Sequence, residues 1–200
     1  MSKAPRHTLL IAVVILILSA GSALAQSTES LNLSSVNIKN FGQMDERFFR
    51  GGQPKEEDYK QLAALGISTI IDLTDNPKAY EKPSVEALGM KYVNIPMSDS
   101  SYPESAKIEQ FLKLTADPGT GKFFVHCAGG RHRTGVMGAV YRFNNYHWNF
   151  DQVYTEMKKY DFYTRWGHGD MKKFVEDYAA NIEHNNATSA VAAQAGAKQK

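Results

Sequence analysis

The apolar positions along the chain follow two spacings, one typical of helices and one typical of buried strands. Segment 55–65 has apolar residues at helical spacing and is followed by Gly66, which is typical of a helix end. Segment 67–73 is a β-branched run bounded by turn residues, and it predicts a buried strand. The short apolar runs at 91–95 and 122–126 predict two further strands.

The remaining periodic segments predict helices that lie between these strands and after the last of them. Those segments are 83–88, 103–116, 133–146, 151–160 and 170–182. Strands separated by helices favour an α/β domain with a largely parallel sheet covered on both faces. We therefore expect a central sheet of four to five strands flanked by helices.

The first 25 residues have the pattern of an export signal. Lys3 and Arg6 precede an apolar run at 9–20, and the Ala-Leu-Ala at 23–25 is typical of a cleavage site. The run is too short to span a bilayer comfortably. We expect an exported, periplasmic or secreted protein with no stable membrane insertion once the signal is cleaved. An uncleaved N-terminal membrane anchor is the alternative.

Composition divides the rest of the chain into three parts. Residues 26–40 are rich in Ser and Asn and predict a linker. Residues 41–184 hold the periodic segments and predict a single structured domain. Residues 185–200 are a low-complexity run of Ala, Gln and Lys, which predicts a disordered tail.

Charge and cysteine content narrow the classes of function. The chain has 23 Lys and Arg against 21 Asp and Glu, and removal of Lys3 and Arg6 leaves 21 of each sign. A formally neutral mature chain has no overall basic field, so no nucleic-acid partner is expected. With one cysteine the chain forms no internal disulfide. A lone thiol in an exported protein is either buried and idle or reactive.

The segment at 125–135 (VHCAGGRHRTG) contains this cysteine, directly after a predicted central strand. In α/β folds, ligands bind where such a strand ends and a helix follows. The small residues at 128–130 allow a tight turn whose N–H groups, backed by the helix N-terminus, bind anions. The partial positive charge of these N–H groups and of the helix N-terminus also stabilises a thiolate. We therefore expect Cys127 to have a lowered pKa and to act as a nucleophile.

Three more side chains complete this chemistry. Arg133 could bind a tetrahedral oxyanion through two parallel donors, and the Thr134 hydroxyl is close enough in sequence to reach the sulfur. A thiolate at the base of a phosphate-sized cradle indicates in-line attack on a phosphoryl group, with a phosphocysteine intermediate. The leaving oxygen needs a proton. Asp99 follows the strand predicted at 91–95, on the sheet edge that also carries Cys127.

These residues resemble a known family. His126-Cys127-x-x-Gly130-x-x-Arg133-Thr134 matches the His-Cys-x5-Arg-Ser/Thr signature of the cysteine-dependent protein tyrosine phosphatase superfamily. The FRGGQP segment at 49–54 and the LGISTIIDL segment at 65–73 resemble the small atypical dual-specificity phosphatases of plants, fungi and bacteria. The resemblance covers roughly residues 47–178.

The resemblance implies a role for each site residue. Cys127 would be the nucleophile, Arg133 the phosphate-binding arginine and Asp99 the general acid, while Thr134 would assist turnover and His126 would hold the environment of the cysteine. The phosphate-binding loop would comprise Ala128, Gly129, Gly130, Arg131, His132 and Arg133. Asp72 and Asp75 end the neighbouring strand and are alternatives to Asp99. The reaction would need no cofactor and no metal.

Several interpretations remain open at this level. The substrate is a phosphorylated protein of the dual-specificity type or a small phosphorylated molecule, such as an inositol polyphosphate or pyrophosphate. A rhodanese-type sulfurtransferase and a non-catalytic phosphate-binding module are further alternatives. His126 could be a hydrogen-bonded core residue, and Arg131 and His132 could be solvated instead of contacting substrate. The aromatic run at 160–166 is interpreted as packing and not as a substrate platform.

Overall fold

The structure is a computed structural model that describes residue 33 and residues 36–165 and 167–197, with side chains as far as residue 189. The predicted export signal at 1–25 lies outside the described residues, as does most of the predicted linker. Among the described helices, none combines the length and the apolar character needed to cross a bilayer.

The described residues form one sheet of five strands in the order β1-β2-β5-β3-β4. The strands are β1 (Gly42–Gln43), β2 (Phe48–Gly51), β3 (Ile67–Asp72), β4 (Lys91–Asn94) and β5 (Lys122–His126). β1 pairs antiparallel with β2, and all other neighbours are parallel. The α/β class and the largely parallel sheet predicted from the sequence are therefore confirmed.

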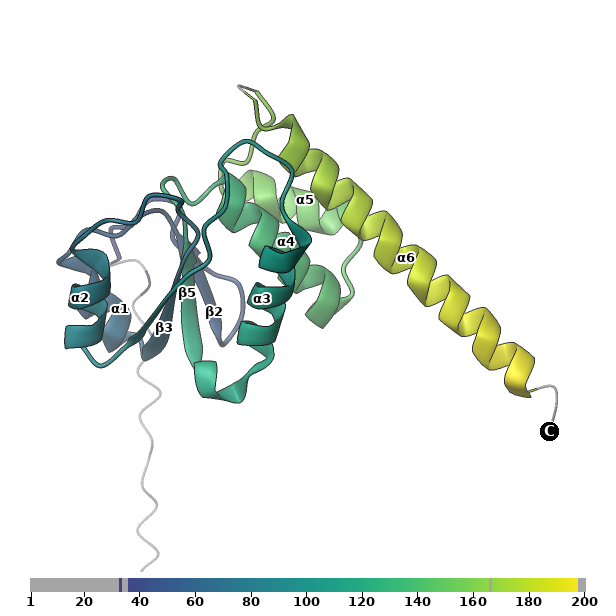
Figure 1. Ribbon diagram of the computed structural model, residues 1–200, viewed down its shortest axis with the longest axis horizontal. Coiled ribbons are helices and arrows are strands. Elements are labelled where there is room, and N and C mark those ends of the chain that lie inside the picture. The colour runs from purple at the N-terminus through teal and green to yellow at the C-terminus, as the bar shows by residue number, and fades with distance from the viewer. Residues whose placement is uncertain (1–32, 34–35, 166, 198–200) are drawn as a thin grey trace, which may run out of the picture. The chain divides into compact units, whose positions relative to one another are not determined.

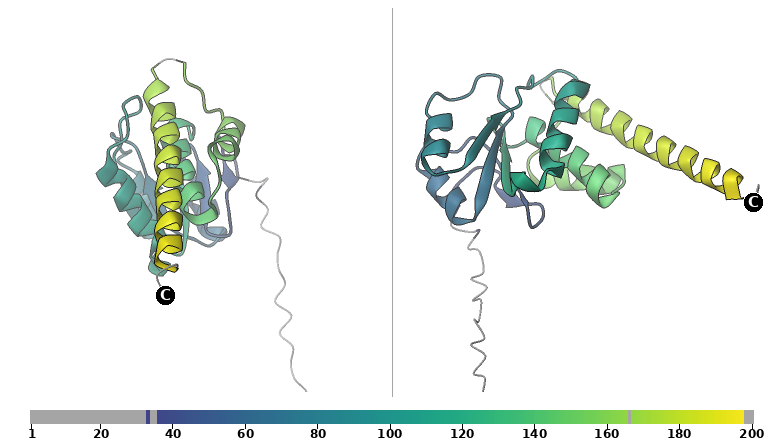
Figure 2. Two further views of the ribbon diagram at one scale, coloured as in Figure 1. Left: turned by 90° about the vertical axis from the view of Figure 1, so that its right-hand side faces the viewer. Right: turned by 60° about the horizontal axis from the view of Figure 1, so that its bottom comes forward.

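Helices cover both faces of this sheet (Figure 1). One face carries α1 (Asp58–Ala64) and α2 (Glu81–Ala87), and the other carries α3 (Ser105–Ala116), α4 (His132–Tyr146), α5 (Phe150–Lys159) and the long α6 (Gly169–Ala197). A short 3₁₀ turn, η2 (Pro118–Thr120), leads from α3 into β5. Figure 2 shows the two groups of helices from other directions.

The alternation of side chains along the central strand gives each face its own core. Phe123 and Val125 of β5 are buried against the α3–α6 side, whereas Phe124 packs with residues from α1 and α2. This alternation follows from the two-residue period of a strand. Because β5 is covered on both faces and lies between β2 and β3, its carboxyl end is a fixed platform for the residues that follow.

Two features differ from the expectations. β2 was not predicted as a strand because it is only four residues long and ends in glycine, yet all four residues are buried beside β5. α6 continues as a helix to Ala197, through the segment for which the sequence predicts a disordered tail. Alanine has the highest helix propensity, which accounts for helix in this segment. Residues 183–189 are exposed, so packing contributes little there.

Candidate active site

Cys127 lies directly after β5, and the loop that follows it leads into the first turn of α4. The thiol is 3% exposed. Its strand pairs with β2 on one side and β3 on the other, and His126 lies opposite both Gly51 and Asp72. The predicted position at the carboxyl end of a central strand, ahead of a helix, is therefore found in the structure.

The environment of Cys127 favours its thiolate. Burial by itself raises the pKa of the thiol, but hydrogen bonds from the side chain and backbone of Thr134, the charge of Arg133 and the backbone N–H of Gly129 outweigh it, and the pKa lies below its ordinary value. The Thr134 hydroxyl is buried and has no oxygen or nitrogen partner among the described residues. It is therefore free to donate to the sulfur.

Gly130 is the point of the loop that requires glycine. Its φ of +66° lies in the left-handed region, and a Cβ at this position would lie 2.4 Å from the carbonyl carbon of Gly51. The loop thus packs directly on the backbone at the carboxyl end of β2. Any side chain at Gly130 would push the loop away from the strand.

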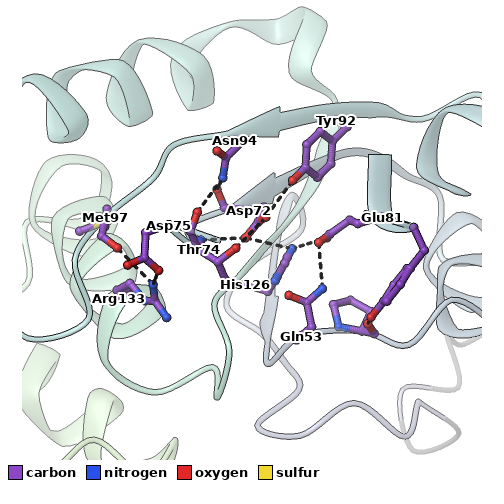
Figure 3. A network of polar contacts seen from close by, with 12 residues as sticks. Gln53, Asp72, Thr74, Asp75, Glu81, Tyr92, Asn94, Met97, His126 and Arg133 are labelled. Atoms are coloured by element: carbon purple, nitrogen blue, oxygen red, sulfur yellow. Dashed lines mark hydrogen bonds and ion pairs between the residues drawn. The ribbon is translucent and has the colours of Figure 1, made fainter. Parts of the chain in front are cut away.

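Arg133 reaches back from the first turn of α4 toward the loop. Its Nη1 donates to Oδ1 of Asp75 at 3.0 Å and to the carbonyl of Met97 at 3.1 Å (Figure 3). Both contacts use one nitrogen, which leaves Nη2 and Nε of the guanidinium without a partner among the described residues. A planar fork held in this way can offer two parallel donors to a phosphoryl group.

His126 is fully buried and forms an ion pair that the sequence did not predict. Its Nε2 lies 2.7 Å from Oε1 of Glu81 on α2 and 3.9 Å from Oδ1 of Asp72. Gln53 donates to the second oxygen of Glu81 at 2.8 Å (Figure 3). His126 is thus a core residue that adjoins Cys127 in the chain, and its pKa is raised because the influence of Glu81, Asp72 and Cys127 outweighs the effect of burial.

Ligand atoms of Asp72, Glu81 and His126 lie within 4.8 Å of one another, a spacing at which carboxylates and imidazole can hold a metal ion. Nε2 of His126 faces Oε1 of Glu81 at 2.7 Å, as an ion-pair contact without hydrogen-bond geometry. Asp72 is equally engaged, since it accepts hydrogen bonds from Thr74 and from the hydroxyl of Tyr92. The cluster is best explained as a buried ion pair with its supporting hydrogen bonds.

A cavity of about 170 Å³ opens above Cys127. The residues that line it are Asp99, Cys127, Ala128, Gly129, Arg131, His132, Arg133 and His168. The structure therefore brings Asp99, from the loop between β4 and α3, into the same pocket as the thiol. Asp72 and Asp75, the alternative candidates for the general acid, do not line this pocket. Asp72 is fully buried, and Asp75 is paired with Arg133.

The two other polar side chains of the loop, Arg131 and His132, have protein partners. Nε2 of His132 lies 3.0 Å from the carbonyl of Tyr163, and its ring stacks on His168 with centroids 3.6 Å apart. Burial and the adjacent His168 lower the pKa of His132 to about 4, so its ring is neutral at pH 7. Nε of Arg131 lies 3.7 Å from Oδ2 of Asp161.

Sequence reasoning missed Glu81, His168 and Gln53 as members of this region. His168 lines the pocket, and its Nδ1 lies 2.8 Å from the carbonyl oxygen of Asp99, 69 residues earlier. No spacing in the sequence signals such a contact. In the aromatic run at 160–166, Phe162 is buried, in keeping with the packing role expected of it, and Trp166 lies outside the described residues.

A buried thiolate, a glycine loop at a helix N-terminus and a returning arginine on an α/β sheet define a cysteine-dependent phosphatase. The chain matches the family described as "DSP-PTPase phosphatase fused to NAD+ Kinase" over residues 25–177. It therefore belongs to this family of phosphatases.

The curated relatives include proteins with two different named phosphatase activities. "Probable tyrosine-protein phosphatase DG1060" of Dictyostelium discoideum is 28% identical over 127 residues, which cover 60% of this chain and 75% of the relative. "Inositol diphosphatase DSP2" of Oryza sativa subsp. japonica is 27% identical over 128 residues, which cover 60% of this chain and 61% of the relative. The family is thus shared while the named substrates differ.

A solved structure supports the fold. The core catalytic domain of the PP-IP phosphatase SIW14 from S. cerevisiae, in complex with citrate, matches with a TM-score of 0.62 at 22% identity. The match covers 76% of this chain and 93% of that chain. The order of strands and helices around the loop is therefore common to both proteins.

Proposed function

We propose that this phosphatase hydrolyses phosphomonoesters on protein side chains, with Cys127 as nucleophile and a phosphocysteine intermediate. The observation that carries the proposal is the pocket above Cys127, which is also lined by Arg133 and Asp99. Nucleophile, oxyanion donor and acid thereby face one volume of about 170 Å³.

In the first step, Sγ of Cys127 attacks phosphorus while the bond to the leaving oxygen breaks. The N–H groups of the loop and the guanidinium of Arg133 bind the three non-bridging oxygens, whose charge they stabilise. Asp99 in its protonated form gives its proton to the leaving oxygen. The products of this step are the alcohol or phenol and a phosphocysteine.

In the second step, water attacks the phosphocysteine and the S–P bond breaks. Asp99, now a carboxylate, takes the proton of the attacking water. The Thr134 hydroxyl donates to the sulfur as it leaves, so the group returns as a thiolate and inorganic phosphate is released. The lowered pKa of Cys127 makes it both a competent nucleophile and a good leaving group.

The charges at the rim favour a single phosphoryl group. Arg131 is paired with Asp161, and Arg133 is paired with Asp75, so the pocket presents little uncompensated positive charge. A small pocket of this kind suits phosphotyrosine and also phosphoserine or phosphothreonine. We therefore favour phosphoprotein substrates of the dual-specificity type.

A second candidate has its own supporting observation. A neighbouring cavity of about 360 Å³ shares Ala128 and Arg133 with the pocket, and its other lining residues are Gln53, Thr74, Asp75, Asn76 and Lys78. Lys78 and the amide of Asn76 could bind a further phosphate of an inositol polyphosphate or an inositol pyrophosphate, whereas the amide of Gln53 already donates to Glu81. This arrangement supports a small polyanionic substrate.

A substrate panel on the purified protein tests both proposals. We expect metal-independent hydrolysis of p-nitrophenyl phosphate and of phosphotyrosyl and phosphothreonyl peptides, all abolished in a folded Cys127→Ser variant. Activity that survives in that variant, or that is lost with EDTA, would overturn the thiolate mechanism. Transfer of sulfur from thiosulfate to cyanide would instead indicate a sulfurtransferase.

The Lys78→Ala variant separates the two substrate classes. For a phosphoprotein phosphatase, we expect kcat/KM on phosphopeptides within about twofold of wild type, since an exposed lysine outside the pocket contributes little. For a polyanion phosphatase, the same variant should lose activity on inositol polyphosphates, with most of the loss in KM. High wild-type activity on inositol pyrophosphates together with none on peptides would overturn the favoured substrate class.

We also propose that the mature protein acts outside the cytoplasm, on the strength of the export pattern in residues 1–25. Fusion of these residues to alkaline phosphatase, which folds only after export, tests the idea. An inactive fusion retained with the cytoplasmic fraction would overturn it.

A further inference from the structure

A buried arginine without a counter-ion lies behind the phosphate-binding loop. Arg50, on β2, is 1% exposed, and its guanidinium carbon lies 3.9 Å from the centre of the Tyr160 ring. Among the described residues, no carboxylate oxygen lies within 4.0 Å of it, and its Nε has no hydrogen-bond partner. A buried charge without a partner lowers stability, so its presence calls for a functional explanation.

The charge on Arg50 persists at neutral pH. Burial lowers the pKa of Arg50 to about 10, and the electrostatic influence of Tyr160, Cys127 and Glu156 opposes the shift. Glu156 is already neutralised by Arg142, which it binds at 2.6 Å and 2.9 Å. Tyr160 contacts the guanidinium through the face of its ring, so the thiolate of Cys127 is the remaining acidic group in this set that Arg50 can offset.

Arg50 also takes part in a set of hydrogen bonds that fixes the loop backbone. Three consecutive carbonyl oxygens of the loop accept hydrogen bonds from the chain around β2. The donors are the backbone N–H of Gln53 to Ala128 (3.3 Å), the side-chain amide of Asn40 to Gly129 (2.8 Å) and Nη2 of Arg50 to Gly130 (2.6 Å).

This set of bonds orients the N–H groups on which anion binding depends. In a planar trans peptide, the N–H of one residue points opposite to the carbonyl of the residue before it. Carbonyls held toward β2 therefore turn the N–H groups of residues 129, 130 and 131 toward the thiol side of the loop. The N–H of Gly129 does act on the Cys127 sulfur.

We propose that Arg50 is a positioning residue of this phosphatase. It fixes the peptide between Gly130 and Arg131 with its N–H facing the phosphoryl group, and it places a permanent positive charge behind the thiolate and the bound anion. The proposal rests on Cys127 as the nucleophile of the proposed function.

The test is the pH dependence of Cys127 alkylation by iodoacetamide in an Arg50→Met variant. Cys127 is the only cysteine of the chain, so alkylation reports on it alone. Loss of the nearby charge should raise the apparent pKa of the thiol by about one unit. We also expect kcat/KM for p-nitrophenyl phosphate to fall about tenfold, less than the 10²–10³ typical for loss of a direct oxyanion donor.

The double variant Arg142→Met/Glu156→Gln is the matched control, because it removes this arginine together with its counter-ion and so leaves no free carboxylate beside Arg50. Arg142 is also a buried arginine and also binds a backbone carbonyl, that of Met44, but it is neutralised by Glu156. Its loss should lower the melting temperature while the alkylation pKa stays at the wild-type value. The groups that face the thiol are unchanged in both variants: His126, Arg133, Thr134, Asp99, His132 and His168.

Two further variants separate the charge of Arg50 from its hydrogen bond. Arg50→Lys keeps the charge, so the alkylation pKa should stay within about 0.3 units of wild type while kcat/KM remains reduced. Asn40→Gly removes the side-chain amide that donates to the carbonyl of Gly129, and glycine tolerates the positive φ of 52° at this position. It should lower kcat/KM with little change in the pKa.

The proposal is overturned if folded Arg50→Met matches the Arg142→Met/Glu156→Gln control in alkylation pKa and in kcat/KM. Should Arg50→Met fail to fold, wild-type kcat/KM in both Arg50→Lys and Asn40→Gly would overturn it. The alkylation titration needs no substrate, so failure of the proposed function, seen as no hydrolysis by wild-type protein, is a separate result.

Discussion

Nε2 of His126 lies 2.7 Å from Oε1 of Glu81, and both side chains are fully buried. Burial alone lowers the pKa of His126, but the hydrogen bond and charge of Glu81 outweigh it and the pKa is raised. Burial alone raises the pKa of Glu81, and the contacts with His126 and Gln53 lower it instead. The pKa of the residue before the nucleophile is therefore raised by Glu81 of α2, which lies on the face of the sheet opposite to α4.

Removal of the negative partner should be costly. Glu81→Gln leaves the His126 charge buried without compensation, and loss of one partner of such a pair typically destabilises by about 3–5 kcal/mol. Urea unfolding followed by circular dichroism measures the difference. The control is Glu86→Gln on the same helix, whose pair with Lys82 is exposed, and it should change stability by less than about 0.5 kcal/mol. Similar effects in both variants would contradict a special role for the buried pair.

The same pair predicts how stability varies with pH. Because the pKa of His126 in the folded protein is above its ordinary 6.5, its contribution is complete below pH 6.5 and is lost as pH rises through the folded-state pKa. The pKa of Glu81 is lowered from 4.5, so its contribution is present above pH 4.5 and is lost as pH falls through the lowered value.

Cys127 changes stability with pH in the direction opposite to His126. Because the pKa of its thiol is lowered in the folded protein, its contribution to stability grows as pH rises toward 9.0. The experiment is therefore done in the Cys127→Ser background, with urea midpoints measured from pH 5 to pH 9. We expect stability to decline above pH 6.5 in this background and the decline to be smaller when Glu81→Gln is added. An unchanged pH profile in the double variant would show that Glu81 does not hold the His126 charge.

The sequence predicted the parts of the site that lie close together in the chain. The spacing from Cys127 to Arg133 spans one loop and one helical turn, and the strand before it is a continuous apolar run, so local patterns define both. Arg50 and Gly130 are 80 residues apart, and Asn40 and Gly129 are 89 apart. These contacts depend on β2 pairing with β5, and no local pattern in FFRG indicates that pairing.

Asp99 was the first candidate for the general acid from the sequence, with Asp72 and Asp75 as alternatives. Asp72, Asp75 and Asp99 all follow strands that end on the same sheet edge, so the sequence left three candidates. The structure separates them by burial and pairing: Asp72 is 0% exposed, Asp75 binds Arg133, and Asp99 lines the pocket. Burial and pairing arise from tertiary packing, so the sequence favoured Asp99 but could not exclude Asp72 and Asp75.

Arg133→Lys should lose more activity than its retained charge suggests. Nη1 of Arg133 is held by Asp75 and Met97, and only a planar fork can keep those bonds and still offer two parallel donors. We expect at least a hundredfold loss in kcat/KM, about 3 kcal/mol. Arg47→Lys is the control, because Arg47 binds the carbonyls of Gly121, Thr115 and Asp117 away from the pocket. A value for Arg133→Lys within fivefold of wild type would mean that Arg133 does not bind the phosphoryl group.

Asp99→Asn tests proton donation to the leaving group. A phenyl or alkyl oxygen of high pKa needs a proton in the transition state, whereas nitrophenolate leaves nearly unaided. General acid catalysis is typically worth about 10²–10⁴-fold, so hydrolysis of phenyl phosphate should lose most of that factor and hydrolysis of p-nitrophenyl phosphate much less. The acidic limb of the pH profile should persist because the thiolate of Cys127 is still required. The basic limb should flatten, because the group that must stay protonated has been removed.

Asp75→Asn is the matched control for this experiment, since it removes a carboxylate near the pocket that is engaged by Arg133. It should affect both substrates to a similar extent, through the position of the guanidinium, and should leave both limbs of the pH profile in place. If Asp99→Asn behaves in this way and Asp75→Asn instead shows the dependence on the leaving group, Asp75 is the acid. The difference between two substrates in one variant identifies the proton donor, because a purely structural disturbance lowers both rates together.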